Sequence, residues 1–186
     1  MDHHDHVALL REGILGSGMV WADFGSGDGA FTLALAELLG AGGRIYSVDR
    51  DGNALERQAQ ALRRRFPHTP VTYRRADFTD ALGLPPLDGI VIANALHFTA
   101  EKKSALRIIR AALRPAGRLV LVEYNTDHGN RWVPYPFSYP TWQALAEEAG
   151  FVDTRLVATR PSRFLGQIYA AVSSRPAVGG EGPAVR

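Results

Sequence analysis

A glycine-rich loop early in the chain carries the residues best suited to chemistry. Residues 23–29 have the sequence Asp-Phe-Gly-Ser-Gly-Asp-Gly, with glycines at alternate positions between an apolar segment and a helix-like one. Glycines of this kind adopt positive φ and let the backbone approach a ligand closely, and the N-terminus of the following helix attracts an anionic group. Taken alone, the loop predicts either a ligand-binding loop or a plain tight turn.

Polar side chains also close the next three strand-like segments. Asp49 ends the second segment, 20 residues after Gly29, where a carboxylate reaches the hydroxyls of a bound ribose. Asp77 and Phe78 follow the third segment, where they suit the exocyclic amine and the ring face of an adenine. Asn94 closes the fourth. Open α/β sheets bind ligands at the carboxyl ends of their strands, so these residues predict one nucleoside-binding site.

Further candidates lie on the loops after the fourth and fifth strand-like segments. His97 follows Asn94 by three residues and is either a general base, since imidazole titrates near neutrality, or a packing residue at a helix start. Tyr124 ends the fifth segment and is the second catalytic candidate. The aromatic, proline-stiffened run 132–139 predicts a lid or pocket wall, or a loop that packs for stability alone. The substrate-binding candidates are Asn125, Trp132 and Tyr135.

Strand-like and helix-like segments alternate along the chain, which predicts a mostly parallel sheet covered by helices on both faces, a three-layer, doubly wound α/β sandwich. Two late segments flank Pro161 and predict an antiparallel hairpin, and residues 3–13 predict a short helix over the carboxyl edge of the sheet, where it serves as lid material. The expected strands are 19–24, 44–49, 71–76, 87–93, 118–124, 153–159 and 164–173. The expected helices are 30–39, 102–113 and 141–149, with a further one that Asp51 caps and Pro67 ends.

Length and composition restrict the class of protein. The chain has 186 residues, a formal charge of +2 and no cysteine, which excludes disulfide scaffolds, zinc ribbons and thiol nucleophiles. It has no apolar run near the roughly 20 residues of a membrane span and no secretory signal, so a cytoplasmic protein without membrane association is expected. One domain over residues 1–173 and a flexible tail over 174–186 are predicted, with a monomer or homodimer as the assembly.

Two clusters of side chains that could bind a metal or a nucleic acid are assigned no binding role. The histidines near the N-terminus are expected to be mobile and weak ligands, so no metal site is predicted. The arginines at 63–65 lie at the end of a predicted helix, where they favour the helix dipole. No stacking aromatic residues separate them, so nucleic acid is not favoured as a partner, and a small-molecule substrate is expected instead.

The sequence resembles the class I, Rossmann-like family of S-adenosylmethionine-dependent methyltransferases over roughly residues 1–173. The resemblance rests on Asp23-x-Gly25-x-Gly27-x-Gly29, Asp49, Asp77-Phe78, Asn94 and the turn 113–119, in which Ala116 stands where the family often has glycine. It implies a seven-stranded sheet with the last strand antiparallel, which agrees with the predicted hairpin. It also implies that the chain is an enzyme with S-adenosyl-L-methionine as cofactor.

The resemblance further implies how the cofactor is held. Gly25 and Gly27 would approach its methionine part and Asp23 its amino group, while Asp49 takes the ribose. The adenine would lie against the residues after the third strand, and the sulfonium near Asn94. The complete set of expected cofactor-binding residues is Asp23, Gly25, Ser26, Gly27, Gly29, Asp49, Arg50, Asp77, Phe78 and Asn94.

Two other functions remain open from the sequence. A nicotinamide-dependent oxidoreductase uses the same fold, and Ala30 satisfies the last position of its glycine fingerprint. Asp23 argues against it, because a carboxylate facing a pyrophosphate repels it but attracts a methionine ammonium. A cofactor-binding subunit without catalysis is the other alternative. With methyl transfer as the function, the expected acceptor is small and partly apolar and contacts His97, Tyr124, Asn125 and residues 132–135.

Overall fold

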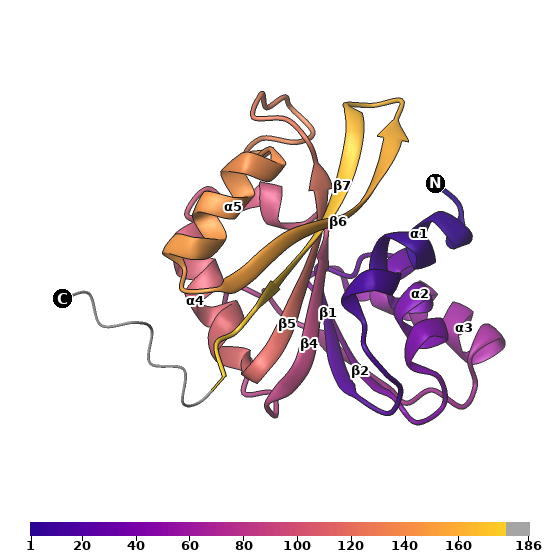
Figure 1. The fold of residues 1–186 in the computed structure, drawn as a ribbon. Helices are drawn as coiled ribbons and strands as arrows, with labels where there is room; N and C mark the ends of the chain where they lie inside the picture. The colour runs from indigo at the N-terminus through magenta and orange to yellow at the C-terminus, as the bar shows by residue number, and fades with distance from the viewer. Residues whose placement is uncertain (178–186) are drawn as a thin grey trace.

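The central strands carry apolar side chains on both faces, which requires helices on both sides of the sheet. In the computed structural model, which describes residues 1–177, Ile90 and Ile92 of β4 (Leu87–Ala93) join one core cluster and Val91 the other. Figure 1 shows α4 and α5 on one face and α1, α2 and α3 on the other. The expected three-layer α/β sandwich is confirmed. The helices are α1 (His3–Leu10), α2 (Ala30–Leu39), α3 (Gly52–Arg65), α4 (Lys102–Ala112) and α5 (Tyr139–Glu148).

Seven strands form one sheet in the order β3-β2-β1-β4-β5-β7-β6. Neighbouring strands are parallel except at β7, which is antiparallel to both β5 and β6, so the predicted mostly parallel sheet and closing hairpin are confirmed. The strand order reverses between β1 and β4, which places the ligand crevice at the carboxyl ends of these strands. The remaining strands are β1 (Val20–Phe24), β2 (Arg44–Asp49), β3 (Val71–Arg75), β5 (Leu113–Tyr124), β6 (Val152–Ser162) and β7 (Gly166–Ser174).

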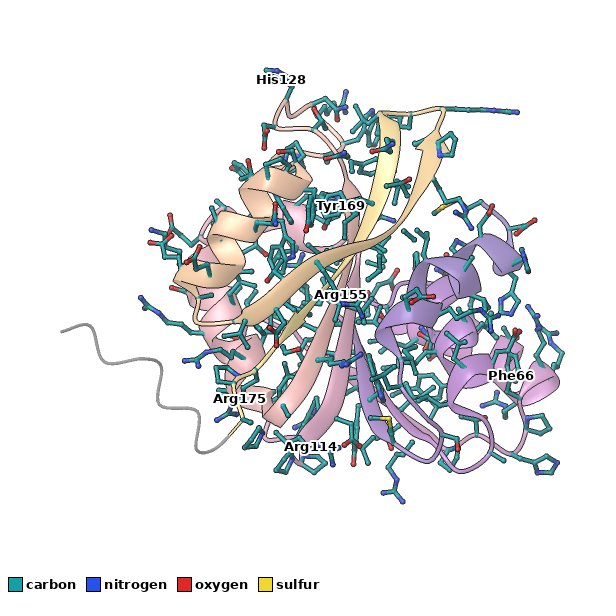
Figure 2. The ribbon with its side chains drawn as sticks, viewed as in Figure 1. Phe66, Arg114, His128, Arg155, Tyr169 and Arg175 are labelled. Carbon is teal, nitrogen blue, oxygen red and sulfur yellow. The ribbon has the colours of Figure 1, made fainter. Side chains whose placement is uncertain are left out.

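The end of the domain lies later than expected. Ser174 is the last residue of β7, and the Arg175 N–H donates to the carbonyl of Gly117 at 2.8 Å. The Arg175 guanidinium also donates to main-chain carbonyls at the end of α4 and the start of β5. Figure 2 shows Arg175 near Arg114, at the end of the sheet opposite His128. The boundary at residue 174 is therefore wrong, and the expected flexibility of residues 178–186 lies outside the described residues.

Helix α1 packs on a face of the sheet beside α2. Val7, Leu9 and Leu10 are buried in the core cluster that includes residues of α2 and β5. The His6 ring lies 4.7 Å from the ring of Phe31, so the helix is anchored along its length. The expectation that α1 supplies a lid is wrong, because its apolar side chains belong to the core. No helix within residues 1–177 is long and apolar enough to cross a membrane.

Candidate functional site

The loops after β1, β2, β3 and β4 enclose a cavity of about 480 Å³ at the carboxyl edge of the sheet. Cavities of this size accommodate small molecules and cofactors. The sequence predicted the strand-end residues to meet at this edge, and most of the expected cofactor-binding residues line the cavity. These are Gly25, Gly27, Asp49, Arg50, Asp77, Phe78 and Asn94.

The glycine loop is held against the end of β2 by its backbone. The N–H groups of Gly25 and Ser26 donate to the carbonyl of Val48 at 2.9 and 3.1 Å. Gly25 has φ +73°, and a Cβ added to it would lie 2.4 Å from the Cβ of Ala95 in the loop after β4. Glycine is therefore required here for both its backbone conformation and its close contact with the neighbouring loop.

Two of the expected cofactor-binding residues shape this loop without lining the cavity. The Ser26 hydroxyl lies 2.8 Å from that of Ser47, which donates to Gln58 Oε1 at 2.6 Å. Gln58 Nε2 in turn donates to the carbonyl of Gly27 at 3.1 Å. A Cβ added at Gly29, whose φ is +85°, would lie 2.2 Å from the Gln58 side chain. Gln58 was not among the expected site residues, because a glutamine on the buried face of α3 carries no chemical signal in the sequence.

Asp49 joins the glycine loop to the start of α3. One carboxylate oxygen accepts from the Gly27 N–H at 2.7 Å, and the other accepts from the Asp51 N–H at 2.8 Å. Asp51 itself caps α3 by accepting from the N–H groups of Asn53 and Ala54, as the sequence predicted. Asp49 thus faces the cavity while its two oxygens fix the backbone around it. A carboxylate has about four lone-pair positions, so capacity remains for a ligand.

Asp77 and its neighbours form the wall after β3. The Asp77 carboxylate accepts from the N–H and hydroxyl of Thr79 at 2.9 and 2.7 Å, and lies 3.3 Å from a guanidinium nitrogen of Arg50. Partial burial raises the pKa of Asp77, but the Thr79 hydrogen bonds and the Arg50 charge outweigh burial and bring the pKa below its usual value. Phe78 stacks on Phe24 and separates this cavity from a smaller, apolar one of about 270 Å³.

Asn94 lines the cavity in a strained backbone conformation, and its side-chain oxygen is buried. Its φ is +50°, a conformation that costs a non-glycine residue roughly 1–2 kcal/mol. Its N–H donates to the carbonyl of Val122 at 2.8 Å. Its buried Oδ1 has no hydrogen-bond partner among the described residues. A buried oxygen without a donor costs free energy, so the conformation of Asn94 is held by the surrounding structure and not by its own hydrogen bonds.

Asp23 lies behind the cavity, which corrects its expected contact with the amino group of a ligand. It is 1% exposed, and its carboxylate accepts from the Thr32 hydroxyl at 2.5 Å. Burial raises the pKa of Asp23 to about 7; the Thr32 hydrogen bond opposes this rise, and the nearby charge of Asp49 adds to it. The expected repulsion between Asp23 and a bound pyrophosphate fails for the same reason, because the side chain does not face the cavity.

The structure also corrects the two catalytic candidates. His97 is 2% exposed and does not line the cavity; its Nδ1 lies 2.7 Å from an oxygen of Glu123. The ring of Tyr124 lies 6.1 Å from that of His97 and likewise stands outside the cavity lining. Burial, with a smaller contribution from Glu123, raises the pKa of Tyr124. The packing interpretation of His97 therefore agrees with the structure.

The expected substrate-binding residues do not form a pocket beside the cavity. The Asn125 amide donates to Gln167 Oε1 at 2.8 Å and accepts from the Tyr139 N–H at 2.9 Å, so it anchors the loop between β5 and α5. Trp132 is 66% exposed and Tyr135 is half exposed. None of the three lines the cavity, whose wall after β4 is completed by Ala95, Phe98 and Thr99. The structure therefore does not bring these three residues to the cavity, and their contact with an acceptor stays a prediction.

Comparison with known proteins gives a consistent family. A family profile described as a methyltransferase domain matches residues 22–119. The chain is 31% identical over 126 residues to a ubiquinone/menaquinone biosynthesis C-methyltransferase of Shewanella frigidimarina, covering 67% of this chain and 48% of that protein. It is 27% identical over 158 residues to an arsenite methyltransferase of Aquipseudomonas alcaligenes, covering 75% and 46%. The chain spans about half the length of these relatives.

Solved structures share the fold. A S-adenosylmethionine-dependent methyltransferase from Aquifex aeolicus superposes with a TM-score of 0.72 at 19% identity, covering 91% of this chain and 89% of that one. A Burkholderia thailandensis 1,6-didemethyltoxoflavin-N1-methyltransferase, solved with bound 1,6-didemethyltoxoflavin and S-adenosylhomocysteine, superposes with a TM-score of 0.74 at 23% identity, covering 94% of this chain and 78% of that one. At these identities the similarity concerns the fold.

Proposed function

We propose that this chain, which belongs to the S-adenosylmethionine-dependent methyltransferases, transfers the methyl group of that cofactor to a small, partly apolar acceptor. The observation that carries the proposal is the cavity at the carboxyl ends of the first four strands. It joins a glycine loop, two carboxylates and an aromatic ring on one side to Asn94 and Phe98 of the loop after β4 on the other.

The residues present fit this cofactor. Asp49 keeps lone pairs for the ribose hydroxyls after accepting two backbone N–H groups. Asp77 and Phe78 supply an acceptor and a ring face for the adenine, and the glycine loop leaves space for the methionine part. Asn94 lines the opposite wall, where the bound molecule would pack against it. Asp23, Ser26 and Gly29 act from behind the cavity, by holding the loop in shape.

Positioning is the main contribution of the chain to the reaction. When bound, the cofactor supplies an electrophilic methyl group on a sulfonium. The lining residues Asp49, Asp77 and Arg50 are all engaged in hydrogen bonds or an ion pair, so their task is to orient and not to carry a proton. Holding two reactants in line supplies up to about 7–11 kcal/mol of a barrier in well-oriented cases.

The acceptor is expected to approach past the exposed ring of Phe98, which borders the cavity after β4. An aromatic side chain at an opening favours contact with an apolar surface. A cofactor-binding subunit without catalysis is the second candidate, favoured by the observation that none of the predicted acceptor residues lines the cavity.

Transfer of a labelled methyl group tests this proposal. Purified protein with methyl-tritiated cofactor is incubated with a panel of small acceptors: a quinol precursor, a nitrogen heterocycle and trivalent arsenic. We expect label in at least one apolar acceptor, and none with the Gly25→Ala variant, whose loop cannot close on Ala95. Cofactor binding without label in any acceptor would favour the non-catalytic subunit.

A further inference from the structure

We infer that the buried pair Glu123 and His97 is a positioning device that holds the loop after β4 against the cofactor cavity and ties to it the loop after β5. The inference rests on the proposed function for its effect on cofactor binding. The part of the inference that concerns the hydrogen bonds of residues 94–99 and 135 does not depend on which ligand binds.

Glu123 is fully buried at the end of β5, and the neighbouring loop supplies its hydrogen-bond donors. One carboxylate oxygen accepts from the N–H groups of Leu96 and His97 at 3.0 and 3.2 Å. The other lies 2.7 Å from His97 Nδ1. A single carboxylate therefore fixes both the backbone of the loop and the ring of its histidine.

Burying a carboxylate at position 123 costs free energy, which indicates that Glu123 has a specific role. Residues 119–122 of the same strand are apolar and buried, and a similar residue at 123 would avoid the desolvation cost of a charge. Three converging donors offset that cost. The donors all belong to one short loop, so the bonds determine where that loop lies relative to β5.

The loop held in this way forms one side of the cavity. Asn94 and Ala95 precede the anchored residues, Phe98 and Thr99 follow them, and all four line the cavity. Ala95 also faces Gly25 so closely that a Cβ at the glycine would clash with it. A shift of the anchored residues would therefore alter the gap between this loop and the glycine loop.

The same anchor reaches the loop between β5 and α5. The carbonyl of His97 accepts from the Tyr135 N–H at 3.0 Å. The centroid of the His97 ring lies 4.3 Å from that of Phe98 and 6.1 Å from that of Tyr124. His97 thus joins a residue of the cavity wall to the loop that the sequence marked as a lid or pocket wall.

Variants of Glu123 and His97 test the device. Glu123→Met fills similar volume without an acceptor, and we expect it to raise the Kd for S-adenosylhomocysteine by about 10-fold or more, as befits loss of hydrogen bonds to a charged group. Glu123→Gln retains an oxygen for the two backbone N–H groups, and we expect a Kd within about threefold of the wild type. His97→Phe keeps the ring packing and removes the Nδ1 contact, and an intermediate increase is expected.

Amide hydrogen exchange measures whether the loop after β4 is held in place when no ligand is bound. In Glu123→Met the amides of Leu96, His97 and Tyr135 should exchange faster than in the wild type. The matched control is Asp88→Ala, which removes another buried carboxylate, one that accepts from the Val20 N–H near the amino-terminal end of β4. It should lower the melting temperature and leave both the Kd and these three amides unchanged.

Three results would overturn the inference. Unchanged protection of the three amides in Glu123→Met would show that the loop does not depend on the carboxylate. An unchanged Kd in both Glu123→Met and His97→Phe would show that the loop position does not matter for binding. A Glu123→Gln enzyme that binds the cofactor normally but has lost turnover would assign His97 to proton transfer instead. Wild-type protein that fails to bind S-adenosylhomocysteine contradicts the proposed function, while the amide exchange still decides the positioning.

Discussion

Replacement of Gly25 by alanine is expected to raise the Kd for S-adenosylhomocysteine by roughly 100-fold or more, about 2.7 kcal/mol. The new Cβ would lie 2.4 Å from the Cβ of Ala95, where ordinary contacts are 3.4–4 Å, so the two loops must separate. The positive φ of +73° adds strain of roughly 1–2 kcal/mol. Both effects occur in the cavity wall, so calorimetric titration should show weak or undetectable binding by a protein that remains folded by circular dichroism.

The Gly40→Ala variant measures the effect of backbone strain without a steric clash. Gly40 has a similar φ of +66° at the end of α2, but a Cβ there would have no neighbour within 4 Å. This variant should lose some stability and bind the cofactor product as the wild type does. Normal affinity in Gly25→Ala would show that the glycine loop does not form the binding surface.

The second large effect concerns Asp23→Asn and the dependence of stability on pH. Because burial raises the pKa of Asp23 to about 7, the folded chain keeps a proton that the unfolded chain loses near pH 4. Between these values the unfolded state binds fewer protons, so this group lowers the free energy of unfolding as pH rises, and the loss is complete above about pH 7. A difference of about three units between the folded and unfolded pKa of Asp23 corresponds to about 4 kcal/mol in the free energy of unfolding.

Asparagine removes the titration and still accepts the hydrogen bond from Thr32. Urea unfolding at pH 4, 6 and 8 should therefore show similar stability for both proteins at pH 4 and a more stable variant at pH 8, by up to about 4 kcal/mol. Asp28→Asn, an exposed carboxylate of the same loop paired with Arg57, is the control and should show no such trend. Parallel pH profiles of Asp23→Asn and wild type would contradict the raised pKa.

The fold was predictable because its signals are local. Apolar strand segments alternate with amphipathic helices, and the polar residues at strand ends fall at one edge of any parallel sheet. This reasoning brought Asp49, Asp77 and Asn94 together correctly. It could not distinguish a side chain that points into the cavity from one that points behind the loop, and so it misplaced Asp23.

The acceptor side was not predictable, because distant partners determine where its side chains lie. The Asn125 amide is held by Gln167 of β7, and the His97 ring by Glu123 of β5. Nothing in the sequence around Asn125 or His97 indicates which distant residue each of them contacts. The available sign that Glu123 needed partners was a lone glutamate directly after the apolar run 119–122.

Calorimetric titration of the wild-type protein with S-adenosylhomocysteine and, separately, with NAD⁺ tests the central claim most directly. The cavity presents Asp49 and Asp77 at the places proposed for the ribose and the adenine of S-adenosylhomocysteine, with the glycine loop beside them for the methionine part. The account predicts saturable 1:1 binding of S-adenosylhomocysteine and no heat of binding from NAD⁺. Saturable binding of NAD⁺ with none of S-adenosylhomocysteine would contradict it.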